Sequence, residues 1–211
     1  MRAAAVLVVA LLVVVLTTAA SGEKAGAIVR GNLAGQNVRL RCPPGDGKPK
    51  GVAIWFHGQA GNVNDRIGTP WLDALRRDGW AVASSDFHLE SWGTPESTDD
   101  TQRLVKWAEK QTGVPVTLWV SGSMGGATSL NAMVHGVAPP PCWYGVKPAV
   151  ALTDMEEVPG GPENIAEAFD GPVPTDRNPI ENVDLLPLET RYRVVSSVDD
   201  QWVIYARTAT A

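Results

Sequence analysis

The residues best suited to chemistry form a run of small side chains that follows an apolar stretch. The run is Ser121-Gly122-Ser123-Met124-Gly125-Gly126, and the apolar, β-branched residues 116–120 come directly before it. A stretch of that length fits one buried strand, and Ala127, Leu130, Met133 and Val134 then recur at helical spacing. A serine at the tip of a strand–turn–helix bend sits on strained backbone with its hydroxyl exposed. We therefore predict that Ser123 is a nucleophile in a G-x-S-x-G elbow whose first glycine is replaced by Ser121.

The same turn could also be a helix N-cap or a phosphate-binding loop. Ser123 could simply cap the helix that follows, since serine is a favoured N-cap residue. A phosphate-binding loop fits less well, because the turn ends without Gly-Lys-Ser/Thr and has no G-x-G-x-x-G pattern. The strand before the turn and the helix after it favour the nucleophile.

The elements that must position this serine alternate along the chain. The expected strands are residues 36–41, 51–56, 80–85, 116–120, 148–153 and 192–197. The expected helices run from Thr69 and Pro70 to Gly79, from Ser97 or Thr98 to Gly113, from the elbow to about Val134, and over 179–186. Alternating strands and helices predict an α/β fold, with a mostly parallel central sheet flanked by helices.

Ligands of such a sheet bind beyond the carboxyl ends of the strands. The segments expected there are 57–61, 86–92, Ser123, Asp154 and Asp200. The loop 57–62 reads His-Gly-Gln-Ala-Gly-Asn, which is poor in bulky side chains and follows a strand expected to be buried on both faces.

Composition and termini bound the organisation of the chain. The 211 residues fit one globular domain over 36–211, preceded by a flexible lead-in at 21–35. Residues 137–143 are expected to form a proline-rich loop, and residues 155–178 a long loop or partial lid. The formal net charge of −5 gives no basic footprint for nucleic acid.

The first twenty residues have the pattern of a secretory signal peptide. Arg2 precedes an apolar run, and small residues follow up to Ala20. An uncleaved membrane anchor is the competing interpretation, because the run nearly reaches the ~20 residues that span a bilayer. We expect a secreted or extracytoplasmic protein with no membrane association after cleavage. Export permits a disulfide between Cys42 and Cys142, although sequence alone leaves that pairing open.

Taken together, these motifs resemble a secreted α/β-hydrolase of the dienelactone hydrolase and prolyl-oligopeptidase-like kind. The resemblance covers roughly residues 36–203 and rests on WFHGQAGN, SGSMGG, and RNPIENVDLL followed by VVSSVDDQWV. It implies Ser123 as the nucleophile and an oxyanion hole made by the backbone N–H groups of Gln59 and Met124. It implies Asp200 as the acid that orients the base, with Asp199 and Asp154 as rivals. It implies neither a cofactor nor a metal.

The sequence departs from this family at the catalytic base. The resemblance implies a histidine some tens of residues beyond Asp200, but the last histidine is His135 and the sequence ends at Ala211. We therefore expect a domain truncated before its last strand and helix. His57 is expected to brace its loop, His88 is a weak substitute for the base, and His135 lies too far along its helix. A metal site built from His57, Asp86 and His88 is disfavoured, because the sequence has no tight ligand motif such as H-E-x-x-H.

Two functional hypotheses follow. The first is an exported serine hydrolase of small carboxylic esters, with peptides as a second substrate class. The second is an inactive binding protein of the same fold, favoured by the missing histidine. The oligomeric state is left open.

Overall fold

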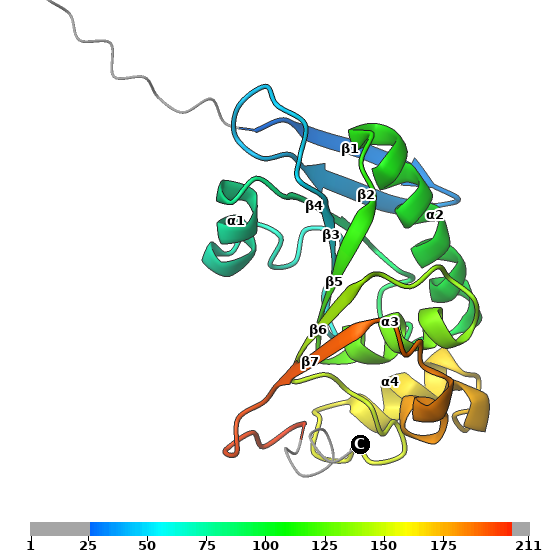
Figure 1. The fold of residues 1–211 in the computed structure, drawn as a ribbon. Helices are drawn as coiled ribbons and strands as arrows, with labels where there is room; N and C mark the ends of the chain where they lie inside the picture. The colour runs from blue at the N-terminus through cyan, green and yellow to red at the C-terminus, as the bar shows by residue number, and fades with distance from the viewer. Residues whose placement is uncertain (1–25, 204–211) are drawn as a thin grey trace, which may run out of the picture.

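The computed structural model describes residues 26–203, which form a seven-stranded sheet in the order β1-β2-β4-β3-β5-β6-β7 (Figure 1). The strands are β1 (Ile28–Leu33), β2 (Gln36–Arg41), β3 (Val52–Phe56), β4 (Ala81–Ser85), β5 (Val116–Gly122), β6 (Cys142–Val146) and β7 (Arg191–Val195). Neighbouring strands in the stretch β4-β3-β5-β6-β7 are parallel, whereas β2 is antiparallel to both β1 and β4. The predicted α/β class with a mostly parallel sheet is confirmed.

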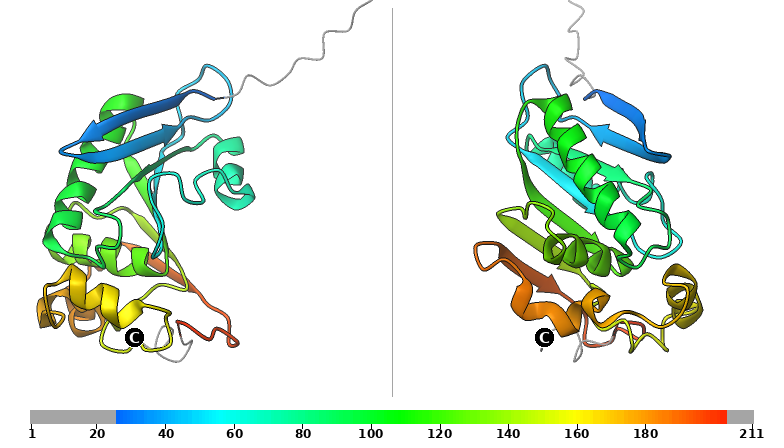
Figure 2. Two further views of the ribbon diagram at one scale, coloured as in Figure 1. Left: turned by 180° about the vertical axis from the view of Figure 1, so that it is seen from behind. Right: turned by 90° about the vertical axis from the view of Figure 1, so that its right-hand side faces the viewer.

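Helices lie on both faces of this sheet. They are α1 (Pro70–Arg77), α2 (Pro95–Thr112), α3 (Met124–Val134) and α4 (Gly161–Ala168), with the short 3₁₀ segments η1 (Thr175–Arg177) and η2 (Pro179–Leu185). Helices α2 and α3 cover one face, and α1 covers part of the other (Figures 1 and 2). Across residues 26–203 there is no helix with the length and apolar character to cross a membrane. The predicted signal peptide at 1–20 and the tail at 204–211 lie outside the described residues.

The core consists of apolar layers on the two faces of the sheet. All five residues of β3 and all five of β4 are buried, as expected for strands covered on both sides. Phe56 and Trp119 pack with their ring centroids 5.1 Å apart on the face toward α2 and α3. On the other face Trp55 meets Trp71 of α1 edge-on, with centroids 5.1 Å apart. Burial of these large rings fixes β3 and β5 at the centre of the sheet.

The expectation of a flexible lead-in at 21–35 is wrong for its second half. Residues Ile28–Leu33 form β1, which pairs with β2 through a two-residue turn. Ala34 and Gly35 both have positive φ, 51° and 93°, the conformation of a hairpin turn whose twist matches the strands. Partly buried and exposed residues alternate along β1, a weak pattern that the composition of the segment hides.

The prediction of a strand at 148–153 is also wrong. Its place in the sheet is taken by β6, which starts inside the loop predicted at 137–143. Ala149 and Leu152 are buried in one apolar cluster with Met124 and Ala127 of α3, whereas Val150 belongs to the main core cluster. An apolar run of this length indicates that a segment is buried, but it does not indicate which element the segment packs against. For Ala149 and Leu152 that element is helix α3.

One helix boundary and one predicted loop also differ from expectation. α2 begins at Pro95 with Thr94 in the N-cap position, before the expected Ser97 or Thr98. Residues 155–178 contain α4 and η1, so this segment is more ordered than the loop or lid that was predicted. The short helix expected at 179–186 is present as η2.

Cys42 and Cys142 are free thiols. Cys42 lies just after β2 and Cys142 begins β6. The strand order puts four inter-strand steps between β2 and β6, which at roughly 4.8 Å each is about 19 Å. Cysteines bridge only when their Cα atoms approach within ~7 Å, so this fold excludes the disulfide.

The close approach of α3 to β3 depends on Gly125. A Cβ at this position would lie 2.3 Å from the carbonyl oxygen of Phe56 and 2.8 Å from that of His57. Neither backbone atom can move without displacing β3 or the loop that follows it. Any side chain at residue 125 therefore separates the elbow from the loop at 57–61.

We predict that Gly125→Ala destabilises the fold by about 1–3 kcal/mol, the usual cost of overpacking. The free energy of unfolding, measured by urea denaturation with tryptophan fluorescence, tests this. Gly47→Ala is the control, because a Cβ at Gly47 meets nothing within 4 Å. Equal stabilities for the two variants would contradict the assigned contact.

Candidate active site

Ser123 occupies the turn between β5 and α3 with strained backbone, φ 49° and ψ −120°. This left-handed conformation is uncommon for a non-glycine residue and usually marks a functional constraint. Three backbone hydrogen bonds hold it: Ser123 N–H donates to Val146 O (3.2 Å), and Ala149 N–H and Gly126 N–H donate to Ser123 O (both 2.8 Å). The Ser123 side chain makes no capping hydrogen bond, so the helix-cap interpretation is wrong.

The loop after β3 lies directly against this turn. A Cβ at Gly58 would be 3.4 Å from Ser123 Cβ, an ordinary van der Waals contact. Within residues 26–203, neither Gln59 N–H nor Met124 N–H donates a hydrogen bond. Both amides are thus available to bind a third group, and their assignment to an oxyanion hole stays a prediction. The Gln59 side chain is anchored separately, with Nε2 donating to Pro159 O at 2.9 Å.

His57 is buried, with 1% of its surface exposed, and both ring nitrogens face backbone carbonyls. Nδ1 lies 2.9 Å from Gly58 O, and Nε2 lies 3.0 Å from Asp86 O. The ring therefore ties the loop after β3 to the loop after β4, as the bracing prediction states. The Asp86 carboxylate is used differently, because it accepts hydrogen bonds from Val63 N–H, Asn37 N–H and the Asn37 side chain. These contacts leave no shared ligand set for His57, Asp86 and His88.

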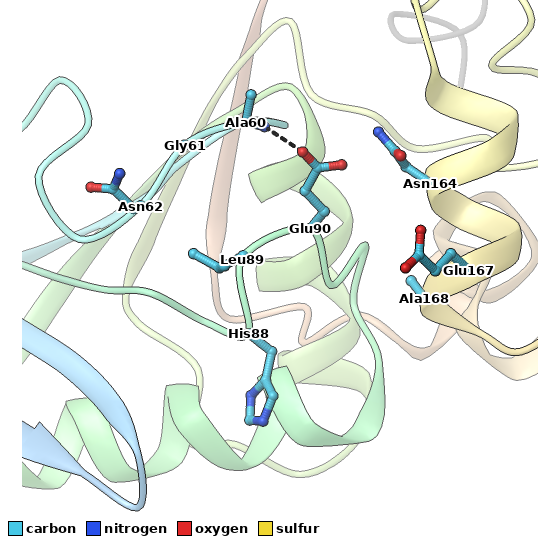
Figure 3. A pocket seen from close by; sticks show the side chains of 9 residues that line it. All are labelled: Ala60, Gly61, Asn62, His88, Leu89, Glu90, Asn164, Glu167 and Ala168. Atoms are coloured by element: carbon cyan, nitrogen blue, oxygen red, sulfur yellow. Dashed lines mark hydrogen bonds between the residues drawn. The ribbon is translucent and has the colours of Figure 1, made fainter.

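His88 does not line the cleft that contains Ser123 and instead lines a second pocket, which Figure 3 shows. Its Nδ1 is 2.6 Å from Asp100 Oδ2 of α2. Burial raises the pKa of Asp100, against the opposing effects of His88 and Arg103. The adjoining pocket of about 680 Å³ also contains Glu90, whose Oε1 accepts a hydrogen bond from Ala60 N–H.

His135 ends α3, and its Nε2 lies 2.8 Å from Asp176 O. This contact anchors the far end of the helix, opposite the end that carries Ser123. Neither His88 nor His135 therefore serves Ser123 in this structure.

Asp200 lies in the same cleft as Ser123, whereas Asp199 and Asp154 do not line it. The Asp200 side chain is 6% exposed, and its Oδ1 accepts hydrogen bonds from the N–H groups of Trp202 (3.0 Å) and Val203 (3.2 Å). Oδ2 lies 2.8 Å from Lys147 Nζ. Burial works against the charge, but the Lys147 ammonium and the two N–H groups outweigh it, so the pKa of Asp200 is lowered.

The cleft has a volume of about 620 Å³. Among the described residues that line it, three are tryptophans, four are charged and none is a histidine. The tryptophans are Trp55, Trp71 and Trp202, and the charged residues are Asp65, Arg66, Lys147 and Asp200. Sequence analysis missed Lys147. Its position after β6 would have pointed to the carboxyl edge of the sheet, had that strand been placed correctly.

The lowered pKa of Asp200 makes a prediction about stability. An aspartate with a depressed folded-state pKa stabilises the protein above its unfolded pKa of about 3.9, and loses this contribution as the pH falls through the folded value. The unfolding free energies of wild type and Asp200→Asn should therefore differ by a constant amount above about pH 5 and converge as the pH falls below about 3.9. Urea denaturation at several pH values measures this, with Asp199→Asn as the exposed control. A difference that stays constant over the whole pH range would contradict the assignment.

Comparisons with solved structures agree on the architecture. Dipeptidyl peptidase 4 of Porphyromonas gingivalis superimposes with a TM-score of 0.62 at 16% identity, over 89% of this chain but only 29% of that one. FphF, a fluorophosphonate-binding serine hydrolase of Staphylococcus aureus, gives 0.62 at 13% identity over 81% and 78% of the two chains. An alpha-beta serine hydrolase homologue of Coxiella burnetii gives 0.57 at 14% identity over 87% and 79%.

This chain spans less than a third of the length of the dipeptidyl peptidase. No family model matches the sequence, and no curated protein matches it. At these identities the comparisons bear on the fold alone. Together with the sheet order and the strained serine between β5 and α3, they show that residues 26–203 adopt the α/β-hydrolase fold.

Proposed function

We propose that this protein is a serine hydrolase that cleaves carboxylic esters, with peptides as a second substrate class. The observation that carries the proposal is the backbone of Ser123, which is strained, fixed by three hydrogen bonds and does not cap its helix. Ser123 lines the cleft, where its hydroxyl would meet the substrate. Such strain is seldom retained without a functional use.

The chemistry would proceed by acyl transfer. Ser123 Oγ attacks the substrate carbonyl carbon, and the N–H groups of Gln59 and Met124 stabilise the negative charge that develops on the carbonyl oxygen. The leaving group departs, and water then releases the acid from the acyl-enzyme. Asp200 would orient and stabilise the base that accepts the serine proton. We further propose export of the protein, which rests on the signal-peptide pattern at 1–20.

A second candidate is a binding protein of this fold that does not turn over its ligand. It is favoured by the lining of the cleft, in which none of the described residues is a histidine. A serine hydroxyl without a base is a weak nucleophile. The two candidates differ in the reactivity of one residue and can be separated by labelling.

We expect a fluorophosphonate probe to label the folded protein at Ser123 and not to label Ser123→Ala. Intact-mass spectrometry followed by peptide mapping measures the adduct. Ser197→Ala is the control, because Ser197 is exposed and does not line the cleft. No adduct on protein with native circular dichroism would support the binding protein instead.

A second expectation concerns the oxyanion hole. Gln59→Ala keeps the backbone N–H, so its labelling rate should fall by less than about tenfold, whereas loss of an oxyanion donor costs about 10²–10³. The rate of probe incorporation tests this, with Gln201→Ala as an exposed control. A hundredfold loss in Gln59→Ala alone would assign the role to the side chain.

A further inference from the structure

Lys147 is joined to the elbow by the backbone on both sides of it. Val146 O accepts the hydrogen bond from Ser123 N–H, and Ala149 N–H donates to Ser123 O. Lys147 itself has a left-handed φ of 48°, and its N–H donates to Val195 O of β7 at 2.7 Å. The turn after β6 therefore links the strand that precedes Asp200 to the serine.

Lys147 and Asp200 line the same cleft, and their side chains meet there. Nζ and Oδ2 are 2.8 Å apart, which makes a close ion pair. Oδ2 is buried, and among the residues that the structure describes its partner is the Lys147 ammonium. A buried carboxylate oxygen needs such a partner, so any other donor that approaches Oδ2 must first displace the ammonium.

The two carboxylate oxygens thus have different roles. Oδ1 is occupied by the N–H groups of Trp202 and Val203, which fix the orientation of the carboxylate. Oδ2 is the oxygen to which a base would donate its N–H, since Asp200 and Ser123 line the same cleft. Lys147 meets that oxygen first. An ammonium has three donors and no lone pair, so in this position it cannot accept the serine proton.

We propose that Lys147 masks Asp200, and that the space between Asp200 and Ser123 binds a small imidazole when the Lys147 ammonium is withdrawn. The inference rests on the proposed function, because it assigns the base site of the same reaction. Lys147 is a positioning residue in this scheme, since it acts on Ser123 only through Asp200. Its ion pair keeps the serine unactivated.

Imidazole would act as the base when Ser123 attacks. One ring nitrogen accepts the proton of Ser123 Oγ while the other donates its N–H to Asp200 Oδ2. With a fluorophosphonate, the Oγ–P bond forms and the P–F bond breaks, so fluoride leaves and the imidazolium returns its proton to solvent. Imidazole is regenerated and acts as a catalyst.

The experiment compares wild type with Lys147→Met, which keeps the length of the side chain and removes its charge. Rates of Ser123 labelling are measured against imidazole concentration. We expect saturable acceleration in Lys147→Met, at about tenfold lower imidazole than in wild type, because an ion pair with a buried carboxylate no longer has to be displaced. In Lys147→Met/Asp200→Asn the acceleration should be lost.

Lys50→Met is the matched control, since it breaks an exposed lysine–aspartate pair, Lys50–Asp78, outside the cleft. It should respond to imidazole as wild type does. Equal responses of wild type and Lys147→Met, or acceleration that survives Asp200→Asn, would overturn the masking.

Binding of imidazole, followed by NMR line broadening, separates this inference from the proposed function. If no variant is labelled at Ser123, the hydrolase proposal fails. The masking then stands if Lys147→Met binds imidazole about tenfold more tightly than wild type and Asp200→Asn abolishes that binding. Equal binding by all variants overturns it.

Discussion

The strained backbone of Ser123 is the constraint to which the rest of the site is fitted. A left-handed φ at a serine costs of order 1–3 kcal/mol and persists only where surrounding contacts enforce it. Here the turn after β6 supplies two of those contacts, and the first turn of α3 supplies the third. Glycine makes the arrangement possible, because a Cβ at Gly122 would lie 2.6 Å from the Trp55 ring and one at Gly126 would lie 2.5 Å from Pro148 Cβ.

Much of the fold could be predicted from the sequence where pattern and context agree. The elbow was predictable because a β-branched run, a turn of small residues and a helical repeat follow one another without a gap. The parallel core was predictable because β3 reads as a continuous apolar run. These signals are local. In the structure the elbow lies between β5 and α3, and β3 lies inside the parallel part of the sheet, as the signals predict.

The errors arose where a residue's role depends on a distant partner. The run at 148–153 is as apolar as a strand, but it packs on α3 and leaves the sheet position to Cys142–Val146. That misplacement also hid Lys147, whose significance comes from Asp200 more than fifty positions later. His57 was interpreted correctly because its loop is short and its bracing contacts reach only the neighbouring strand end.

The exposure of β7 has a consequence for local unfolding beside the cleft. All five of its residues are exposed, and within residues 26–203 it pairs with β6 alone. Local opening is easiest in segments with little burial, so β7 is expected to fray while β3 and β5 stay closed. Asp200 follows β7, whereas Ser123 follows β5. Amide hydrogen exchange is therefore expected to be faster in β7 than in β5, so the backbone that leads to Asp200 opens more readily than the backbone that leads to Ser123.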